Sequence, residues 1–128
     1  MNKNYKILLV CDDEAIAYLK SLAHISRNVE FLCDGDEAVA AIEQRTFDLV
    51  LLDVRSPTAA MLRTVTLKSP DSEVVVVASH PTLADAKEAV RLGAYDYVAK
   101  PVGPHEVINL SGAALTHKRW ALHAEHRP

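Results

Sequence analysis

Five short apolar runs alternate with five longer segments of mixed character along this chain, and this alternation restricts the fold more than any other feature. Apolar runs of this length, bounded by polar residues, are typical of parallel strands that are buried on both faces. The alternation predicts strands at residues 5–11, 28–33, 47–53, 73–78 and 95–99. It predicts helices at residues 14–26, 36–45, 59–68, 82–92 and 104–123. Five successive strand–helix units predict an α/β fold with a doubly wound, five-stranded parallel sheet and right-handed crossovers.

Length, charge and cysteine content narrow the class of protein. A chain of 128 residues is about one domain, and 49% apolar residues are enough for a single core. The net charge is −3 and no basic stripe precedes the C-terminal tail, so nucleic-acid binding by this segment is not expected. Cys11 and Cys33 each end an apolar run, which predicts two reduced core thiols. The first apolar run is too short for a signal peptide or a membrane span, and we predict a cytoplasmic protein.

Charged residues follow the apolar runs of three predicted strands. Asp12 and Asp13 come after the first run, Asp53 after the third, and Lys100 after the fifth. In an open α/β sheet, ligands bind outside the carboxyl ends of the strands, so these side chains should converge. Three carboxylates in one cleft repel one another unless a cation joins them, and their oxygen ligands favour Mg²⁺. A lysine beside that cation indicates a site that handles a phosphoryl group.

Three segments, taken in order and each at the end of a predicted strand, connect the chain with a known family. They are VCDDE at 10–14, LVLLDVRSP at 49–57 and GAYDYVAKP at 93–101. With them, roughly residues 4–116 resemble the receiver domain of bacterial two-component response regulators, and the last segment is most similar to receivers of the nitrogen-regulator type. The resemblance implies a flavodoxin-like (βα)5 receiver domain in residues 1–116. Residues 117–128 would be a C-terminal helix extension or the start of a linker.

The resemblance also assigns roles at the strand ends. Asp53 would be the phosphoacceptor, taking a phosphoryl group from a phosphohistidine on a partner histidine kinase. Mg²⁺ would be held by Asp53, by Asp13 directly, by Asp12 through water, and by the backbone carbonyl of Arg55. Lys100 would neutralise the phosphoryl oxygens and pair with a carboxylate in their absence. Helix capping is the alternative role for the three carboxylates, and a solvated surface lysine is the alternative for Lys100.

Other residues near the fifth strand bear on switching. The resemblance implies a cis peptide bond before Pro101, and it places Tyr97 at the family's aromatic switch position; a half-buried strand tyrosine is the alternative. We predict that Tyr95 packs against the sheet. We also predict a homodimer through the face formed by the fourth helix, the fifth strand and the fifth helix. Trp120 lies beyond the expected core, and an exposed large aromatic residue often marks a partner surface.

The chain departs from the family pattern in two places. The family carries Thr or Ser at the end of the fourth strand, and its spacing from Lys100 places Ala78 there, with Ser79 one residue later. Successive side chains of a strand point to opposite faces, so Ser79 does not replace the missing hydroxyl without a backbone shift. The loop at 56–61 lacks the family's Gly, and we predict a short or irregular third helix after it.

These features favour a phosphorylation-dependent signalling switch with slow autodephosphorylation rather than a dedicated enzyme. An atypical receiver with weakened or lost switching, acting as a constitutive interaction module, is an alternative that Ala78 keeps open. A phosphatase of the aspartate-based type is disfavoured, because Arg55 stands where its second Asp would be. The six histidines show no spacing typical of a metal site together with Cys or carboxylate. The chain could be a stand-alone regulator or the receiver of a longer protein, and the nitrogen-regulator resemblance favours the second.

Overall fold

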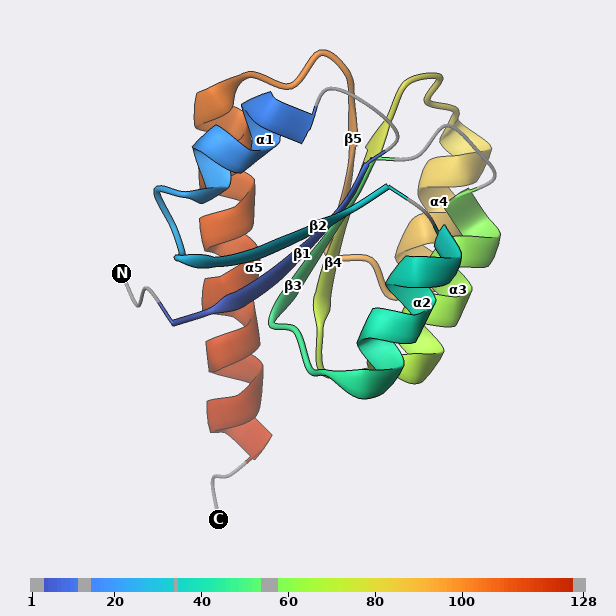
Figure 1. Cartoon of the computed structure of the whole chain (residues 1–128). Helices are drawn as coiled ribbons and strands as arrows, with labels where there is room; N and C mark the ends of the chain where they lie inside the picture. Colours follow the sequence, from blue (N-terminus) through green and yellow to red (C-terminus); the bar gives the residue numbers. More distant parts are fainter. Residues whose placement is uncertain (1–3, 12–14, 34, 54–57, 126–128) are drawn as a thin grey trace.

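The computed structural model describes residues 4–11, 15–33, 35–53 and 58–125, and within them strands and helices alternate (Figure 1). The strands are β1 (Lys6–Cys11), β2 (Asn28–Leu32), β3 (Leu49–Asp53), β4 (Glu73–Ala78) and β5 (Asp96–Ala99). The helices are α1 (Ala15–Leu22), α2 (Gly35–Gln44), α3 (Thr58–Lys68), α4 (Leu83–Arg91) and α5 (Pro104–Glu125). This alternation confirms the predicted α/β class.

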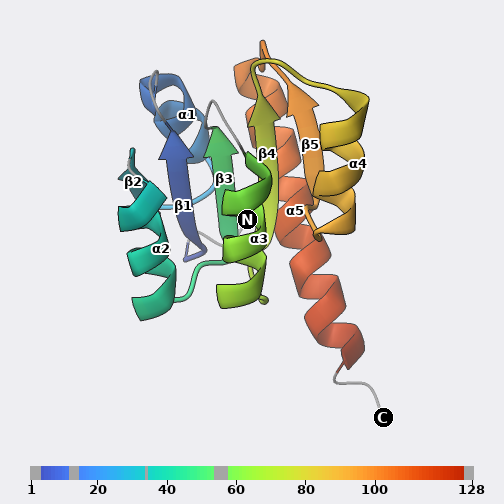
Figure 2. The same cartoon turned by 90° about the vertical axis from the view of Figure 1, so that its right-hand side faces the viewer.

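The five strands form one parallel sheet in the order β2-β1-β3-β4-β5, which Figure 2 shows from one face. The chain runs outward from β1 to β2, then returns to β3 and continues in the opposite direction. The topological switch point of this doubly wound order lies between β1 and β3, and ligands of such sheets bind beside it. The predicted five-stranded parallel sheet is therefore confirmed.

Helices cover both faces of the sheet, with α1 and α5 on one face and α2, α3 and α4 on the other (Figures 1 and 2). The alternating side chains of each strand divide the core accordingly. Ile7, Leu9 and Cys11 of β1 belong to the cluster beneath α1 and α5, which we call the α1/α5 core. Leu8 and Val10 belong to the cluster beneath the other three helices, the α2–α4 core. Burial on both faces explains why the central strands read as continuous apolar runs.

Two expectations about local structure are wrong. The third helix is neither short nor irregular, because α3 is continuous for 11 residues and buries Leu62 and Val65 against the sheet. The hydroxyls of Thr64 and Thr66 donate to carbonyls four residues earlier, which gives these poor helix formers internal partners. Cys33 is exposed rather than part of the core, since the edge strand β2 ends one residue before it.

Other helix ends differ by a few residues from the predicted limits. Helix α1 ends at Leu22 instead of residue 26, and turns occupy 23–25. Helix α5 runs two residues past the predicted end at 123 and extends below the sheet in both ribbon views. Among the described residues, no helix combines the length and apolar character needed to cross a membrane.

Candidate functional site

The carboxyl ends of β1 and β3 place Asp53 at the switch point of the sheet. Asp53 is the last residue of β3, and the parallel register pairs it with Cys11, the last residue of β1. Its side chain follows Leu51 on the face of the α1/α5 core, and the residue is only 4% exposed. A carboxylate this deeply buried is stable only where charged or polar groups pair with its oxygens.

Lys100 supplies a positive charge to this carboxylate. Its Nζ lies 2.8 Å from Oδ1 of Asp53, and the lysine side chain is 27% exposed. The backbone fixes this approach, because the Lys100 amide donates to the carbonyl of Ala78 at 2.9 Å, just after β4 and β5 end their pairing at Ala78 and Ala99. The peptide bond between Lys100 and Pro101 is cis. The two residues, 47 positions apart in the chain, thus meet at one edge of the sheet.

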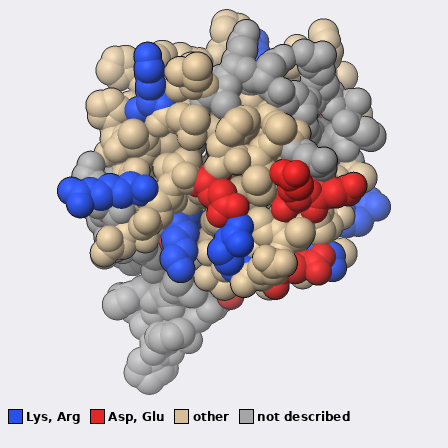
Figure 3. All heavy atoms as spheres, in the orientation of Figure 1, with Lys and Arg blue, Asp and Glu red and all other residues tan. Residues whose placement is uncertain are grey.

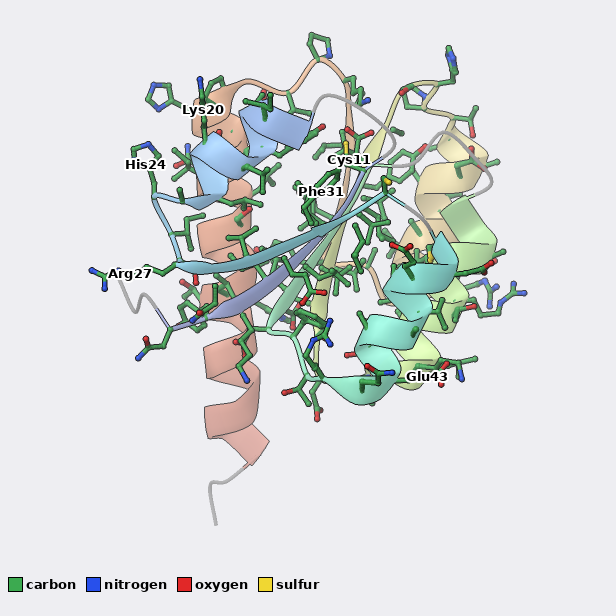
Figure 4. The ribbon with its side chains drawn as sticks, viewed as in Figure 1. Cys11, Lys20, His24, Arg27, Phe31 and Glu43 are labelled. Atoms are coloured by element: carbon green, nitrogen blue, oxygen red, sulfur yellow. The ribbon has the colours of Figure 1, made fainter. Side chains whose placement is uncertain are left out.

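The second oxygen of the Asp53 carboxylate faces a thiol. The Sγ of Cys11 donates to Oδ2 of Asp53 across 3.8 Å, within reach of a hydrogen bond from sulfur, and Cys11 is fully buried. Figure 4 labels Cys11 at the carboxyl end of β1, between the two helical layers. Sequence reasoning treated this residue only as a core thiol. Its position directly before the acidic pair was the available signal, but only the register of β1 with β3 identifies Asp53 as its neighbour.

The other predicted metal ligands, Asp12, Asp13 and Arg55, lie outside the described residues. Within the described ranges no group of three or more His, Cys, Asp or Glu side chains is arranged to hold a metal ion. Asp53 contributes the hard carboxylate oxygens that Mg²⁺ prefers, so the donor chemistry at the switch point fits the predicted cation. The full ligand set stays a prediction.

The predicted switching residues lie around the ends of β4 and β5. Ala78 is the last residue of β4 and is buried, whereas Ser79 is exposed in the bend that follows. Tyr97 pairs with Val76 in the sheet, is partly buried, and packs against the α2–α4 core.

Two other aromatic residues were singled out in the sequence. Tyr95 packs against the α1/α5 core, as expected, and its ring also contacts that of His117, with the ring centroids 5.3 Å apart. The side chain of Trp120 lies outside the described part of the chain.

Figure 3 shows both acidic and basic side chains on the drawn surface, separated by residues of other kinds. Several form ion pairs, such as Arg45 with Glu30 and Lys68 with Glu43. On α4, Arg91 donates to Glu88 and holds the pKa of that carboxyl below its usual value. These pairs are exposed, unlike the pair at the switch point, so they stabilise the surface only weakly.

Comparison with known proteins identifies the family. The model of the response regulator receiver domain matches residues 7–111. The chain is 29% identical over 116 residues to the DNA-binding transcriptional regulator NtrC of Salmonella typhimurium, covering 87% of this chain and 25% of NtrC. It is 34% identical over 90 residues to the regulatory protein LuxO of Vibrio cholerae, covering 68% of this chain and 20% of LuxO. It therefore spans about a quarter or less of the length of these relatives.

Solved structures agree with this assignment. A CheY-like receiver domain protein from Methanospirillum hungatei superposes with a TM-score of 0.84 at 25% identity, over 91% of this chain and 98% of that one. NtrX from Brucella abortus gives a TM-score of 0.84 at 27% identity, over 94% of this chain and 29% of NtrX. A buried aspartate paired with a lysine at the switch point, on this fold and with these relatives, leads to one conclusion: the chain belongs to the response regulator receiver domain family.

Proposed function

We propose that this domain is a phosphoacceptor signalling switch in which Asp53 receives a phosphoryl group from a histidine kinase. The observation that carries the proposal is the buried Asp53 at the switch point with Lys100 on one of its oxygens, in a receiver-family chain. A carboxylate oxygen of Asp53 attacks phosphorus, the N–P bond of the phosphohistidine breaks, and the imidazole leaves with the electron pair. Asp53 then carries an acyl phosphate.

Two positively charged groups, Mg²⁺ and Lys100, would offset the negative charge of Asp53 and of the phosphoryl group. Mg²⁺ would be held by Asp12, Asp13, Asp53 and the backbone carbonyl of Arg55, and when bound it would offset the charge of the phosphoryl oxygens. Lys100 neutralises the carboxylate before transfer and is close enough to follow the charge onto the phosphoryl group afterwards. The Lys100 side chain is 27% exposed, whereas the Asp53 side chain with which it pairs is only 4% exposed.

The proposed output surface is the face formed by α4, β5 and α5. Tyr97 of β5 packs inward next to the end of β4, where a change at the phosphorylation site would first reach the neighbouring strand. We propose that phosphorylation alters this face and favours a homodimer through it, in the cytoplasm. Because NtrC is a DNA-binding transcriptional regulator and this chain spans a quarter of it, we further propose that the domain controls transcription through a longer protein. Sedimentation with and without beryllofluoride tests the dimer, and a monomer in both states contradicts it.

A specific observation favours a second function, a receiver with weakened switching. Ala78 has no hydroxyl for the phosphoryl group, and Ser79 is exposed in a bend outside the strand. Losing one neutral hydrogen bond costs about 1 kcal/mol, a sizeable part of a two-state bias of a few kcal/mol. Ala78→Thr should enlarge the chemical-shift response to beryllofluoride without greatly changing phosphoryl uptake. A full response of the wild-type domain, with no gain from Ala78→Thr, would remove this alternative.

Acetyl phosphate with Mg²⁺, followed by intact-mass measurement, tests the main proposal. The wild-type domain should gain one phosphoryl group, Asp53→Asn should gain none, and Asp13→Ala should bind Mg²⁺ weakly and label slowly. Asp71→Asn is the matched control, because Asp71 is exposed just before β4, at the opposite end of the strands. An undiminished mass gain in Asp53→Asn contradicts the assignment of the phosphoacceptor.

A further inference from the structure

The Cys11 thiol contacts the proposed phosphoacceptor and is not used in the scheme above. Cys11, which is labelled in Figure 4, is fully buried. It lies opposite Asp53 in the β1–β3 register and donates to Oδ2 of Asp53 at 3.8 Å. We propose that Cys11 is a positioning residue that fixes the Asp53 carboxylate and shortens the lifetime of its phosphorylated form. The proposal rests on the proposed role of Asp53 as phosphoacceptor.

The geometry gives the two carboxylate oxygens of Asp53 different partners. Oδ1 lies 2.8 Å from the Lys100 ammonium, and Oδ2 accepts from the Cys11 thiol. Since Asp53 is only 4% exposed, water has little access to replace either partner. Partners on both oxygens restrict rotation of the carboxylate about the Cβ–Cγ bond of Asp53. Cys11 therefore helps to set the orientation in which Asp53 meets a phosphoryl donor.

The same hydrogen bond discriminates between the free and the phosphorylated states. A hydrogen bond to an ionised acceptor is roughly twice as strong as one to a neutral acceptor. The free carboxylate carries a full charge, whereas the acyl phosphate leaves only a neutral carbonyl oxygen on the Asp53 side chain. A donor at Oδ2 therefore stabilises the carboxylate more than the acyl phosphate.

Hydrolysis of the acyl phosphate makes use of this difference. Water attacks phosphorus, the P–O bond to Asp53 breaks, the carboxylate leaves with the electron pair, and the water protons end on inorganic phosphate and solvent. Negative charge grows on the carboxyl group as the bond breaks, and a thiol already aimed at Oδ2 stabilises that charge. Cys11 should thus accelerate loss of the phosphoryl group.

Two substitutions separate the donor from the volume of the side chain. Cys11→Val removes the thiol while filling a similar space in a strand, where a β-branched residue packs well. Cys11→Ser keeps a donor at the same position. Cys33→Val is the matched control, because Cys33 is the exposed cysteine beyond β2. Thermal unfolding of each variant verifies that it is folded before its kinetics are compared.

The experiment phosphorylates each variant of the domain with acetyl phosphate and Mg²⁺, removes the donor, and follows decay by intact mass. We expect the half-life of the phosphorylated domain to lengthen roughly two- to fivefold in Cys11→Val, the change in rate that corresponds to the loss of one weak hydrogen bond. The half-life should remain near the wild-type value in Cys11→Ser and Cys33→Val. In the Cys33→Val background, the infrared S–H stretching band reports Cys11 alone. It should move to higher frequency when Asp53→Ala removes the acceptor.

The outcomes distinguish this proposal from the one on which it rests. If the wild-type domain gains no phosphoryl group, the proposed function fails and the role of Cys11 fails with it. If the wild type labels but Cys11→Val decays at the wild-type rate or faster, only the role of Cys11 is overturned. A slow decay in Cys11→Ser equal to that of Cys11→Val, or an S–H band unmoved by Asp53→Ala, also overturns it, because then no donor acts on Asp53.

Discussion

Removal of the Lys100 charge tests how strongly the candidate site depends on the ion pair at its centre. Lys100→Met keeps most of the aliphatic stem and deletes the ammonium group that lies 2.8 Å from Oδ1 of Asp53. In the wild-type domain Asp53 is only 4% exposed, so Lys100 is the main source of compensating charge within the described structure. A buried charge that loses its partner is strongly destabilising, because its desolvation is no longer offset.

The geometry sets the magnitude. At 2.8 Å and an effective dielectric constant of about 20, the gross attraction between the two charges is about 6 kcal/mol. Desolvation of both groups offsets most of this attraction, and removing one partner of a fully buried pair costs about 3–5 kcal/mol. Lys100 is 27% exposed, so water can partly solvate the remaining carboxylate, and the expected loss is about 2 kcal/mol. A domain of this size should then melt about 8 °C lower.

Urea denaturation at neutral pH in EDTA measures this loss without divalent cations. The matched control is Lys68→Met, since the Lys68–Glu43 pair is also a lysine–carboxylate contact, at 3.4 Å, but both side chains are about half exposed. That substitution should cost less than about 0.5 kcal/mol. In Asp53→Asn the effect of Lys100→Met should shrink, because no charge is left uncompensated. An equal cost for Lys100→Met and Lys68→Met would refute the reasoning that burial controls the strength of the pair.

Three further predictions concern stability away from the candidate site. The Ser111 hydroxyl is fully buried without a hydrogen-bond partner in the described structure, so Ser111→Ala should raise the free energy of unfolding by about 1 kcal/mol in urea denaturation. Gly93 has a φ of 101° after α4, so Gly93→Ala should lower the melting temperature, at a cost of about 1 kcal/mol, although its new Cβ has room. The hydrogen bond from Arg91 lowers the pKa of Glu88, so its contribution is present above the unfolded-state pKa and is lost as pH falls through the folded-state value. Urea midpoints of wild type and Glu88→Gln should accordingly converge in acid; a difference that grows in acid would reverse the sign of this argument.

The sequence predicts the sheet well because burial on both faces leaves little freedom to the central strands. The middle residues of β3 and β4 are all apolar. An amphipathic helix would have polar residues at some of these positions, so the runs favour strands that are buried on both faces. Ligands of such sheets bind at the carboxyl ends of the strands, so the positions of Asp53 and Lys100 at strand ends predict that they lie close together, before any side-chain contact is known. The same rule does not say which residue of β1 lies opposite Asp53, because a shift of one residue in register would turn Cys11 to the other face. The contact between Cys11 and Asp53 therefore required the structure.

Whether a residue at the end of a strand is buried or exposed is also hard to predict from the sequence, because it depends on the order of the strands in the sheet. Cys33 ends an apolar run much as Cys11 does, yet one is exposed and the other buried. The difference comes from the strand order, which places β1 in the middle of the sheet and β2 at its edge. Sequence patterns give the periodicity of each element but carry little information on which strand has a neighbour on both sides.

The sheet register also places the proposed phosphoacceptor and the position proposed to govern the conformational response on opposite faces of the sheet. Asp53 shares the face of the α1/α5 core with Cys11, while Ala78 follows Val76 on the opposite face, the one against which Tyr97 packs. Ala78 still supports Lys100 through its backbone carbonyl, and that contact does not depend on the side chain at this position. A hydroxyl introduced at Ala78 would therefore lie on the Tyr97 face, so a bond from it to a phosphoryl group on Asp53 would bear on Tyr97 and leave the Asp53–Lys100 pair in place. This is why uptake of the phosphoryl group and the conformational response should be separable in this domain by a single substitution.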